Sequence, residues 1–210
     1  MIKSIIFDFD GVITDSVDSK GEAFFELFKG NGIKIQNLAK KYHYQNLGVS
    51  RYQKIEFILN NYLEKEKNKK EKYLLNFEKL VKKKVIEAKL IYGVLNFLNK
   101  NHLNYLFFIS SATPTNELKE IIQKKKISKY FKNVFGSPQK KTEHIKFIKK
   151  KYKLKNKEII FIGDTKNDYN SAYKSKIKFI GLKNKYEKFE NFDFVIKNFY
   201  NFKKKLINLN

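Results

Sequence analysis

Cysteine is absent from this 210-residue chain, and its absence excludes several kinds of site. Without thiols the chain can form no disulfide framework, no thiolate nucleophile and no zinc–thiolate centre. A thiol-free composition suits a reducing compartment, so we expect a cytoplasmic location. Long apolar runs are also missing. None approaches the roughly 20 residues of a membrane-spanning helix, and the first residues lack the layout of a signal peptide, so we expect no membrane partner.

Arginine is nearly absent as well. Only Arg51 is an arginine among the 45 basic residues, although the formal net charge is +24. Nucleic-acid sites usually rely on arginine for bidentate contacts, whereas the lysines here are spread along the whole chain. We therefore interpret the charge as a solvated lysine coat and expect no nucleic-acid partner. Some attraction of anionic small molecules would follow from it in any case.

Linkers rich in proline, glycine and serine are missing too, and no internal repeat is present. Apolar residues at helical spacing dominate residues 18–88, where no strand is convincing. Short apolar strands and helices alternate from residue 92 onward. The predicted strands cover residues 4–7, 105–109, 133–135, 158–162, 177–180 and 194–196, and the predicted helices in this part cover 94–101, 114–125, 142–152, 168–175 and 198–209.

This alternation predicts an α/β fold, a doubly wound, Rossmann-like parallel sheet with helices on both faces. The helical stretch between the first strand and the rest is then an inserted α-helical cap. We expect residues 1–15 and 90–210 to form the core domain and residues 16–89 to form the cap domain.

Asp8 and Asp10 follow the first apolar run directly. Residues two apart on an extended chain face the same way, so both carboxylates should point to one place. Burying two carboxylates together is costly unless a cation or a shared proton offsets their repulsion. A turn at Asp10-Gly11 is the plainer alternative, but it leaves Asp8 unexplained. The pair therefore indicates a metal site at the end of a buried strand.

Polar residues also follow the later strands, and ligands gather at the carboxyl ends of strands in such sheets. Ser110 and Ser111 follow the second predicted strand, Lys140 and Lys141 follow the third, and the fourth ends in Gly163-Asp164 with Asp168 close behind.

In this order, the four stations resemble the four motifs of the haloacid dehalogenase-like hydrolase superfamily and cover essentially the whole chain. The segment from Asp8 to Ser16 and the pair Asp164 and Asp168 are its most specific parts. The helical insertion is similar to the cap of the phosphoglycolate phosphatase and β-phosphoglucomutase branch.

The resemblance implies an aspartyl-phosphate mechanism. It makes Asp8 the nucleophile and Asp10 the general acid and base. Mg²⁺ would be held by Asp8, the carbonyl of Asp10 and Asp164, because this ion prefers oxygen ligands. Asp168 would orient a ligand water or a neighbouring lysine, or would simply open a helix as an acidic first-turn residue.

The resemblance also implies a set of phosphate contacts. Ser110 would bond a phosphoryl oxygen, and a lysine would neutralise its charge, for which we favour Lys141 over Lys140. Gly11 and Ser111 belong to the expected substrate contacts. The alternatives are that the serines cap the turn at residues 113–114 and that the lysines are surface charge.

Two residues of the cap complete the expected substrate contacts. Arg51, in the run Gly48-Val49-Ser50-Arg51, resembles an arginine that grips the far end of the substrate in the mutase branch; the alternative is an ordinary residue at a helix start. Lys20 stands where those mutases carry a histidine, which speaks against mutase activity. His43, His102 and His144 show no metal or triad spacing and receive no role.

These features predict a Mg²⁺-dependent phosphatase that acts on a small phosphorylated metabolite. A sugar phosphate, a polyol phosphate or a precursor of a surface polysaccharide would suit it, which suggests carbohydrate metabolism. A phosphomutase is the nearest alternative. An alternative of another class is a basic nucleic-acid-binding protein on an inactive scaffold, which a steep salt dependence of binding would reveal. We expect a monomer or a homodimer.

Overall fold

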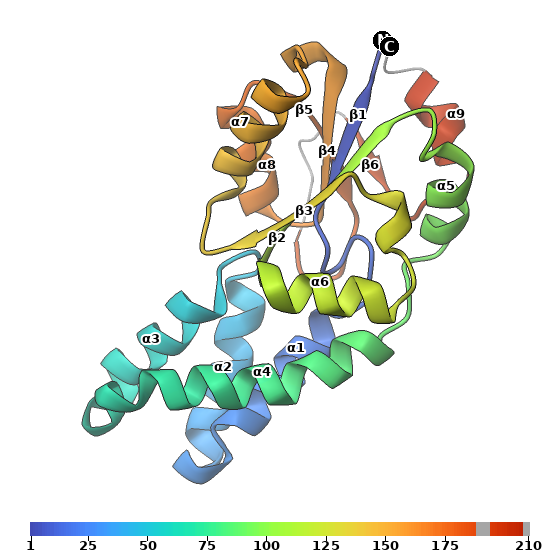
Figure 1. Ribbon diagram of the computed structural model, residues 1–210. Helices are drawn as coiled ribbons and strands as arrows, with labels where there is room; N and C mark the ends of the chain where they lie inside the picture. Colours follow the sequence, from blue (N-terminus) through green and yellow to red (C-terminus); the bar gives the residue numbers. More distant parts are fainter. Residues whose placement is uncertain (188–193, 208–210) are drawn as a thin grey trace.

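A parallel sheet lies at the centre of the computed structural model, which describes residues 1–187 and 194–207 (Figure 1). Its strands in the described residues are β1 (Ser4–Phe7), β2 (Leu106–Pro114), β3 (Asn133–Ser137), β4 (Ile159–Gly163), β5 (Lys178–Leu182) and β6 (Val195–Ile196). Their order is β3-β2-β1-β4-β5-β6, and all neighbours are parallel. The order reverses at β1, which opens a crevice beside its carboxyl end. The predicted doubly wound α/β fold is confirmed.

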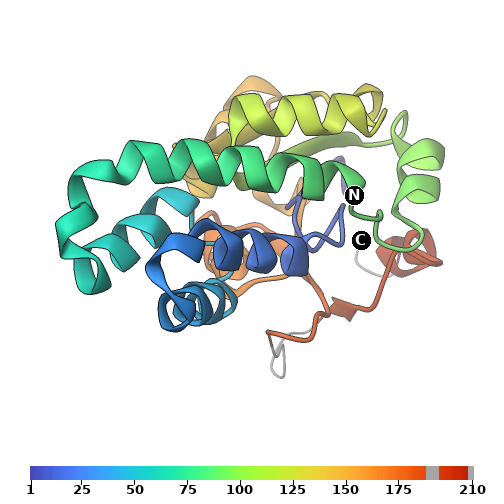
Figure 2. The ribbon, with the colours of Figure 1, turned by 90° about the horizontal axis from the view of Figure 1, so that it is seen from below.

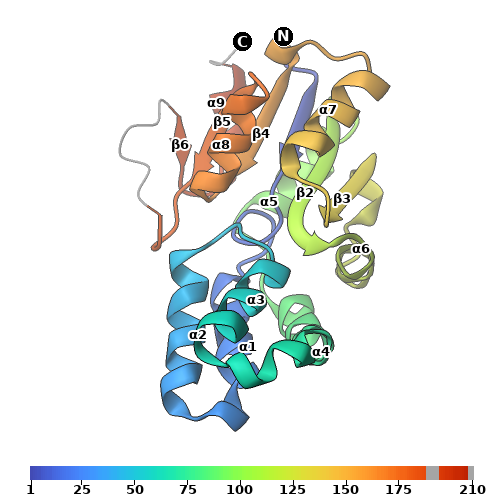
Figure 3. The same cartoon turned by 90° about the vertical axis from the view of Figure 1, so that its left-hand side faces the viewer.

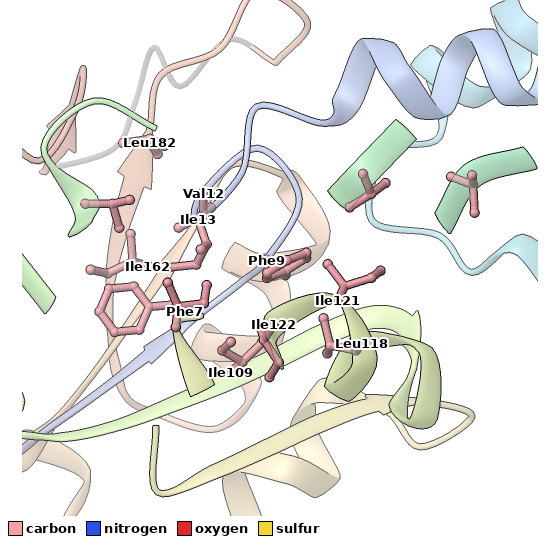
Figure 4. Packing of buried hydrophobic residues seen from close by; sticks show 14 of the residues in the cluster. Phe7, Phe9, Val12, Ile13, Ile109, Leu118, Ile121, Ile122, Ile162 and Leu182 are labelled. Carbon is pink, nitrogen blue, oxygen red and sulfur yellow. The ribbon is translucent and has the colours of Figure 1, made fainter. Parts of the chain in front are cut away.

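Helices cover both faces of this sheet (Figure 3). One face packs against α5 (Val94–Asn101), α6 (Thr115–Lys124) and α9 (Phe202–Ile207), and the other against α7 (Lys141–Lys151) and α8 (Lys166–Lys174). Alternate residues of β1 divide between the two cores, with Phe7 in the first and Ile6 in the second. Figure 4 shows Phe7, Ile109 and Ile122 in the first core. Because β1 is buried on both faces, its sequence is almost continuously apolar.

Residues 16–89, here called the insertion, lie beyond the carboxyl ends of the strands (Figures 1 and 2). The insertion consists of α1 (Val17–Leu27), α2 (Ile33–Gln45), α3 (Arg51–Tyr62) and α4 (Lys70–Glu87), with short 3-10 turns η1 (Lys29–Asn31) and η2 (Glu64–Lys69). Two further 3-10 turns in the core are η3 (Ser128–Tyr130) and η4 (Asn156–Glu158). No helix in the described residues is both long and apolar enough to span a membrane.

Two segments that run side by side join the insertion to the core. Asp15 N–H donates to the Lys89 carbonyl at 2.8 Å, and Ile91 N–H donates to the Ile13 carbonyl at 3.0 Å. The insertion also touches the core through α4, which lies beside α6 in both views (Figures 1 and 2). It therefore covers the crevice at the end of β1.

The predicted elements differ from the observed ones mainly at their ends. β2 continues to Pro114, past its predicted end, because Pro114 pairs with Ser137 of β3 beyond an irregularity in the ladder. A search for apolar runs misses such a polar extension. Ser50 caps α3, with Oγ accepting from Gln53 N–H at 3.4 Å. The closing helix predicted over residues 198–209 is shorter and begins at Phe202, and its predicted last two positions lie outside the described residues.

Candidate active site

Asp8 lies where β1 ends, between the ends of β2 and β4. Its N–H donates to the Ile162 carbonyl at 2.8 Å, which extends the pairing with β4 by one residue and fixes the backbone. The residue is only 5% exposed. A carboxylate this deep needs a cation or a proton nearby.

Lys141, at the first turn of α7, supplies one cation. Its Nζ donates to Asp8 Oδ1 at 2.7 Å and also to Asp168 Oδ1. Lys140, the other candidate lysine, is exposed at the start of the same helix. The structure thus places the favoured lysine, Lys141, at the site.

Three buried carboxylates surround this single lysine. Asp8, Asp164 and Asp168 each offer one oxygen, and these oxygens lie within 4.8 Å of one another. One ammonium group cannot balance three negative charges, and Asp164 Oδ1 is buried without a hydrogen-bond partner in the described structure. Hard cations such as Mg²⁺ prefer oxygen ligands of this kind. The cluster therefore fits a divalent cation.

The protonation of the cluster reflects the same excess of negative charge. Burial raises the pKa of Asp8 to about 7, with the charges of Asp168 and Asp10 adding to the effect and that of Lys141 opposing it. Burial, together with Asp8 and Asp168, raises the pKa of Asp164 well above its usual value. Burial alone would lower the pKa of Lys141, but the neighbouring carboxylates raise it, so this lysine stays charged.

Gly11 and Asn184 position Asp164. Gly11 has φ +82°, and a Cβ there would lie 2.1 Å from Asp164 Oδ2, so no larger residue fits. Asn184 Nδ2 donates to the Asp164 carbonyl at 2.6 Å and to its Oδ2 at 3.1 Å. Gly11 thus makes room for the carboxylate, and the substrate contact predicted for it stays a prediction. Asn184 was missed, although it follows β5 in the same way as the other polar residues follow their strands.

Asp10 faces a different set of partners and is not part of the acidic cluster. Lys20 Nζ donates to its Oδ2, as does Thr113 Oγ1 at 3.1 Å, and Ser16 Oγ donates to Oδ1 at 2.7 Å. Burial alone would raise the pKa of Asp10, but Lys20 and the hydroxyl donors together hold it below its usual value. The side chain of Asp10 is therefore bound by an ammonium and by hydroxyl groups, while the metal ligand predicted from this residue is its backbone carbonyl, which stays a prediction. Lys20, expected to contact substrate, holds Asp10.

Ser110 and Ser111 point in opposite directions, as consecutive strand residues do. Ser110 Oγ is fully buried and lies 2.8 Å from His144 Nδ1. Ser111 instead lines the cavity that contains Asp8. This placement departs from the prediction for Ser110 and favours Ser111 as the phosphate contact. His144, which received no role, holds Ser110.

Asp168 takes both of the places considered for it. Its Oδ2 accepts from Thr165 N–H at 3.1 Å and from Thr165 Oγ1 at 2.7 Å at the start of α8, while its Oδ1 accepts from Lys141. One carboxylate thus begins a helix and orients the lysine of the site.

Arg51 is engaged by the protein itself. Its two terminal nitrogens donate to Glu117 of α6 at 2.7 and 2.6 Å, and the two side chains are 6% and 3% exposed. The guanidinium also stacks on Phe77, 4.8 Å from the ring centre. The bidentate partner predicted for Arg51 is therefore a carboxylate of the core domain, not a substrate group. The residue links the insertion to the core.

A cavity of about 50 Å³ separates the insertion from the strand ends. The core contributes Asp8, Asp164, Lys141 and Ser111 to its wall, and the insertion contributes residues that include Lys54 and His43. Neither of the latter was proposed from the sequence, because one of 44 lysines and an isolated histidine carry no local signal. A space of this size holds only a few water-sized groups, comparable to one phosphoryl group.

The chain is similar to several known proteins. The model of the family described as haloacid dehalogenase-like hydrolase matches residues 5–182. The structure is similar to that of a β-phosphoglucomutase from Clostridium difficile, with a TM-score of 0.80, 22% identity and 99% and 96% of the two chains covered. It is also similar to a predicted phosphatase from Clostridium acetobutylicum, with a TM-score of 0.81, 18% identity and 99% coverage of both chains.

A predicted phosphoglycolate phosphatase from Haemophilus somnus 129pt is a third similar structure, with a TM-score of 0.76, 19% identity and 98% coverage of both chains. At these identities the structural similarity establishes the fold alone. No curated protein matches the sequence.

Proposed function

Since the chain belongs to the haloacid dehalogenase-like hydrolase family, we propose that it is a Mg²⁺-dependent phosphatase that hydrolyses a small phosphate monoester through an aspartyl-phosphate intermediate. The observation that carries the proposal is the buried group of Asp8, Asp164, Asp168 and Lys141, of which Asp8, Asp164 and Lys141 line one cavity. A sugar phosphate or a polyol phosphate, including a precursor of a surface polysaccharide, is the kind of substrate we consider.

Asp8 is the nucleophile in this proposal. Lys141 occupies its Oδ1, so Oδ2 is the atom available to attack phosphorus. Asp8, Asp164 and Asp168 would hold the metal, which would supply positive charge that keeps Asp8 ionised and neutralises phosphoryl oxygens. The ammonium of Lys141 and the hydroxyl of Ser111 would stabilise the charge that develops on the transferring group.

Asp10 would move the proton. As general acid it would protonate the leaving alkoxide, and as general base it would then activate the water that hydrolyses the aspartyl phosphate. Lys20, Ser16 and Thr113 hold its carboxylate in place, and their donation favours the ionised form. That form is the one needed for the second step. The insertion would act as a cap that excludes bulk water from the first.

Replacing Asp8 with Asn tests the proposal, because the change removes the nucleophile at almost constant volume. Hydrolysis of p-nitrophenyl phosphate should fall by about 10⁴-fold or more, while circular dichroism shows an unchanged fold. Asp15→Asn is the matched control. Asp15 lies in the same motif but is exposed, so the activity of this variant should stay near that of wild type.

Removing the metal tests the other half of the proposal. A chelator should abolish activity and added Mg²⁺ should restore it.

Release of free phosphate without an activating bisphosphate would separate a phosphatase from a phosphomutase. Retention of most activity by Asp8→Asn would falsify the mechanism.

A further inference from the structure

Lys54 is a buried lysine without an anionic partner. It lies on α3 and is 3% exposed. Its Nζ contacts only neutral groups of His43, with Nδ1 at 3.1 Å and the carbonyl oxygen at 3.4 Å, and it lies 5.6 Å from the centre of the Phe24 ring. No carboxylate of the described residues lies within 4.0 Å of it. Burial of an unpaired ammonium is unfavourable, so its presence requires an explanation.

The surroundings of Lys54 increase this cost. The nearby acid, Asp10, is already bound by Lys20, and the charge of Lys20 repels a second cation. Burial, with that repulsion, lowers the pKa of Lys54 to about 7. Burial and the charges of Lys54 and Lys20 lower the pKa of His43 as well. Three nitrogen bases therefore converge on one small region whose nearby acid, Asp10, is already paired with Lys20.

This region is the far wall of the reaction cavity. Lys54, His43 and Lys20 line the same cavity as Asp8, and a second cavity of about 30 Å³ beside it shares these three residues. A phosphoryl group at Asp8 would direct the rest of its molecule past Asp10 toward Lys54. Arg51, which also lines the second cavity, is not available for that end of the substrate because Glu117 occupies both of its terminal nitrogens.

We propose that Lys54 determines the substrate class of this site: its ammonium binds a second anionic group, a carboxylate or a phosphate, on the leaving group of a small phosphate monoester. The proposal rests on the proposed phosphatase function and narrows its substrates. An anion there would pair the buried charge and keep Lys54 protonated. The small cavities favour a short leaving group.

Turnover of matched substrates tests the proposal. Wild type should hydrolyse 2-phosphoglycolate and propanediol bisphosphate with a higher kcat/KM than the neutral ethyl and propyl phosphates. Comparing 2-phosphoglycolate, which carries a carboxylate, with propanediol bisphosphate, which carries a second phosphate, shows which anion is preferred. Lys54→Met keeps most of the length of the side chain and removes its charge, so it should lower kcat/KM for the anionic substrates by about 10- to 100-fold. Its kcat/KM for the neutral ethyl and propyl phosphates should fall by a smaller factor, so the variant should lose the preference for anionic leaving groups.

Lys41→Met is the matched control, since Lys41 is an exposed lysine of the same insertion. It should leave the preference for anionic leaving groups unchanged. Lys54→Arg, which restores the charge, should recover part of the lost kcat/KM. Thermal unfolding gives a further control. Without ligand, Lys54→Met should melt at or above the wild-type Tm, because it removes an unpaired buried charge.

A binding measurement separates this proposal from the phosphatase function. Calorimetry with 3-phosphonopropionate and propylphosphonate requires no turnover. Wild type should bind the first more tightly, and Lys54→Met should bind the two alike. Equal binding by wild type, or an equal loss of both anionic and neutral substrates in Lys54→Met, would overturn the role of Lys54 even if the enzyme is an active phosphatase. If instead no ester is hydrolysed but the binding preference persists, the phosphatase function fails and the anion site stands.

Discussion

Removing one partner of the Arg51–Glu117 pair is expected to open the insertion. The pair joins α3 of the insertion to α6 of the core through two short, almost fully buried hydrogen bonds. Breaking a buried ion pair of this kind costs about 3–5 kcal/mol, because the remaining charge is stranded away from water. The stranded charge can regain water only if the insertion moves away from the core. The ratio of closed to open molecules should therefore fall by a factor between about 10² and about 4 × 10³.

The variants Arg51→Met, Glu117→Leu and their combination separate the pair from its packing. Methionine can keep the contact with Phe77, and the double variant leaves no charge unpaired. Each single variant should show faster amide hydrogen exchange in α3 and α6 and a larger radius by small-angle X-ray scattering. The double variant should return to within about 1 kcal/mol of wild type.

The Lys82–Glu120 pair is the matched control, because it also joins the insertion to α6. Lys82 Nζ lies 2.7 Å from Glu120 Oε2, but the side chains of Lys82 and Glu120 are 30% and 57% exposed. Lys82→Met should therefore change the closing free energy by at most about 1 kcal/mol. The reasoning is refuted if Arg51→Met raises KM while Glu117→Leu leaves KM, exchange and scattering unchanged. Arg51 would then contact the substrate.

Three further predictions concern the carboxylates. Mg²⁺ should raise the Tm of wild type, and Asp164→Asn should lose this increase. Gly11→Ala should also lose the increase in Tm, because the added Cβ would collide with Asp164. Thermal unfolding with and without Mg²⁺ measures the effect in both variants. Lys20→Met should destabilise the fold most at neutral pH, because burial then raises the pKa of Asp10. Urea titrations should show that the difference in the free energy of unfolding between wild type and Lys20→Met shrinks as the pH falls. It shrinks first as the pH passes the raised pKa of Asp10 in the variant, and it disappears below the lowered pKa of Asp10 in wild type.

The fold could be predicted because its signals are local. The burial of β1 on both faces makes its sequence apolar. Asp8 and Asp10 were identified as a pair because they follow this run two residues apart. Asp164 and Lys141 were found in the same way, since each follows a strand. Asn184 follows β5 and carries the same local signal.

Contacts between distant segments could not be predicted. The sequence marked Arg51 as unusual, but its partner Glu117 is 66 residues away and sits on a helix that shows no special pattern. The choice between Ser110 and Ser111 depends on which side of β2 faces the cavity. That side is set by the pairing of β2 with its neighbours, because a shift of one residue exchanges the two.

The lysines show most clearly what composition leaves open. Their number predicts a solvated coat, and most of them do lie at the surface. Among the side chains that the structure describes, however, Lys54 and Lys141 are buried, and both line the same cavity. Lys141 has two carboxylates as partners, whereas Lys54 has none. In our proposal, the charge left unpaired on one wall of the cavity narrows the substrate class, which neither the motifs nor the net charge do.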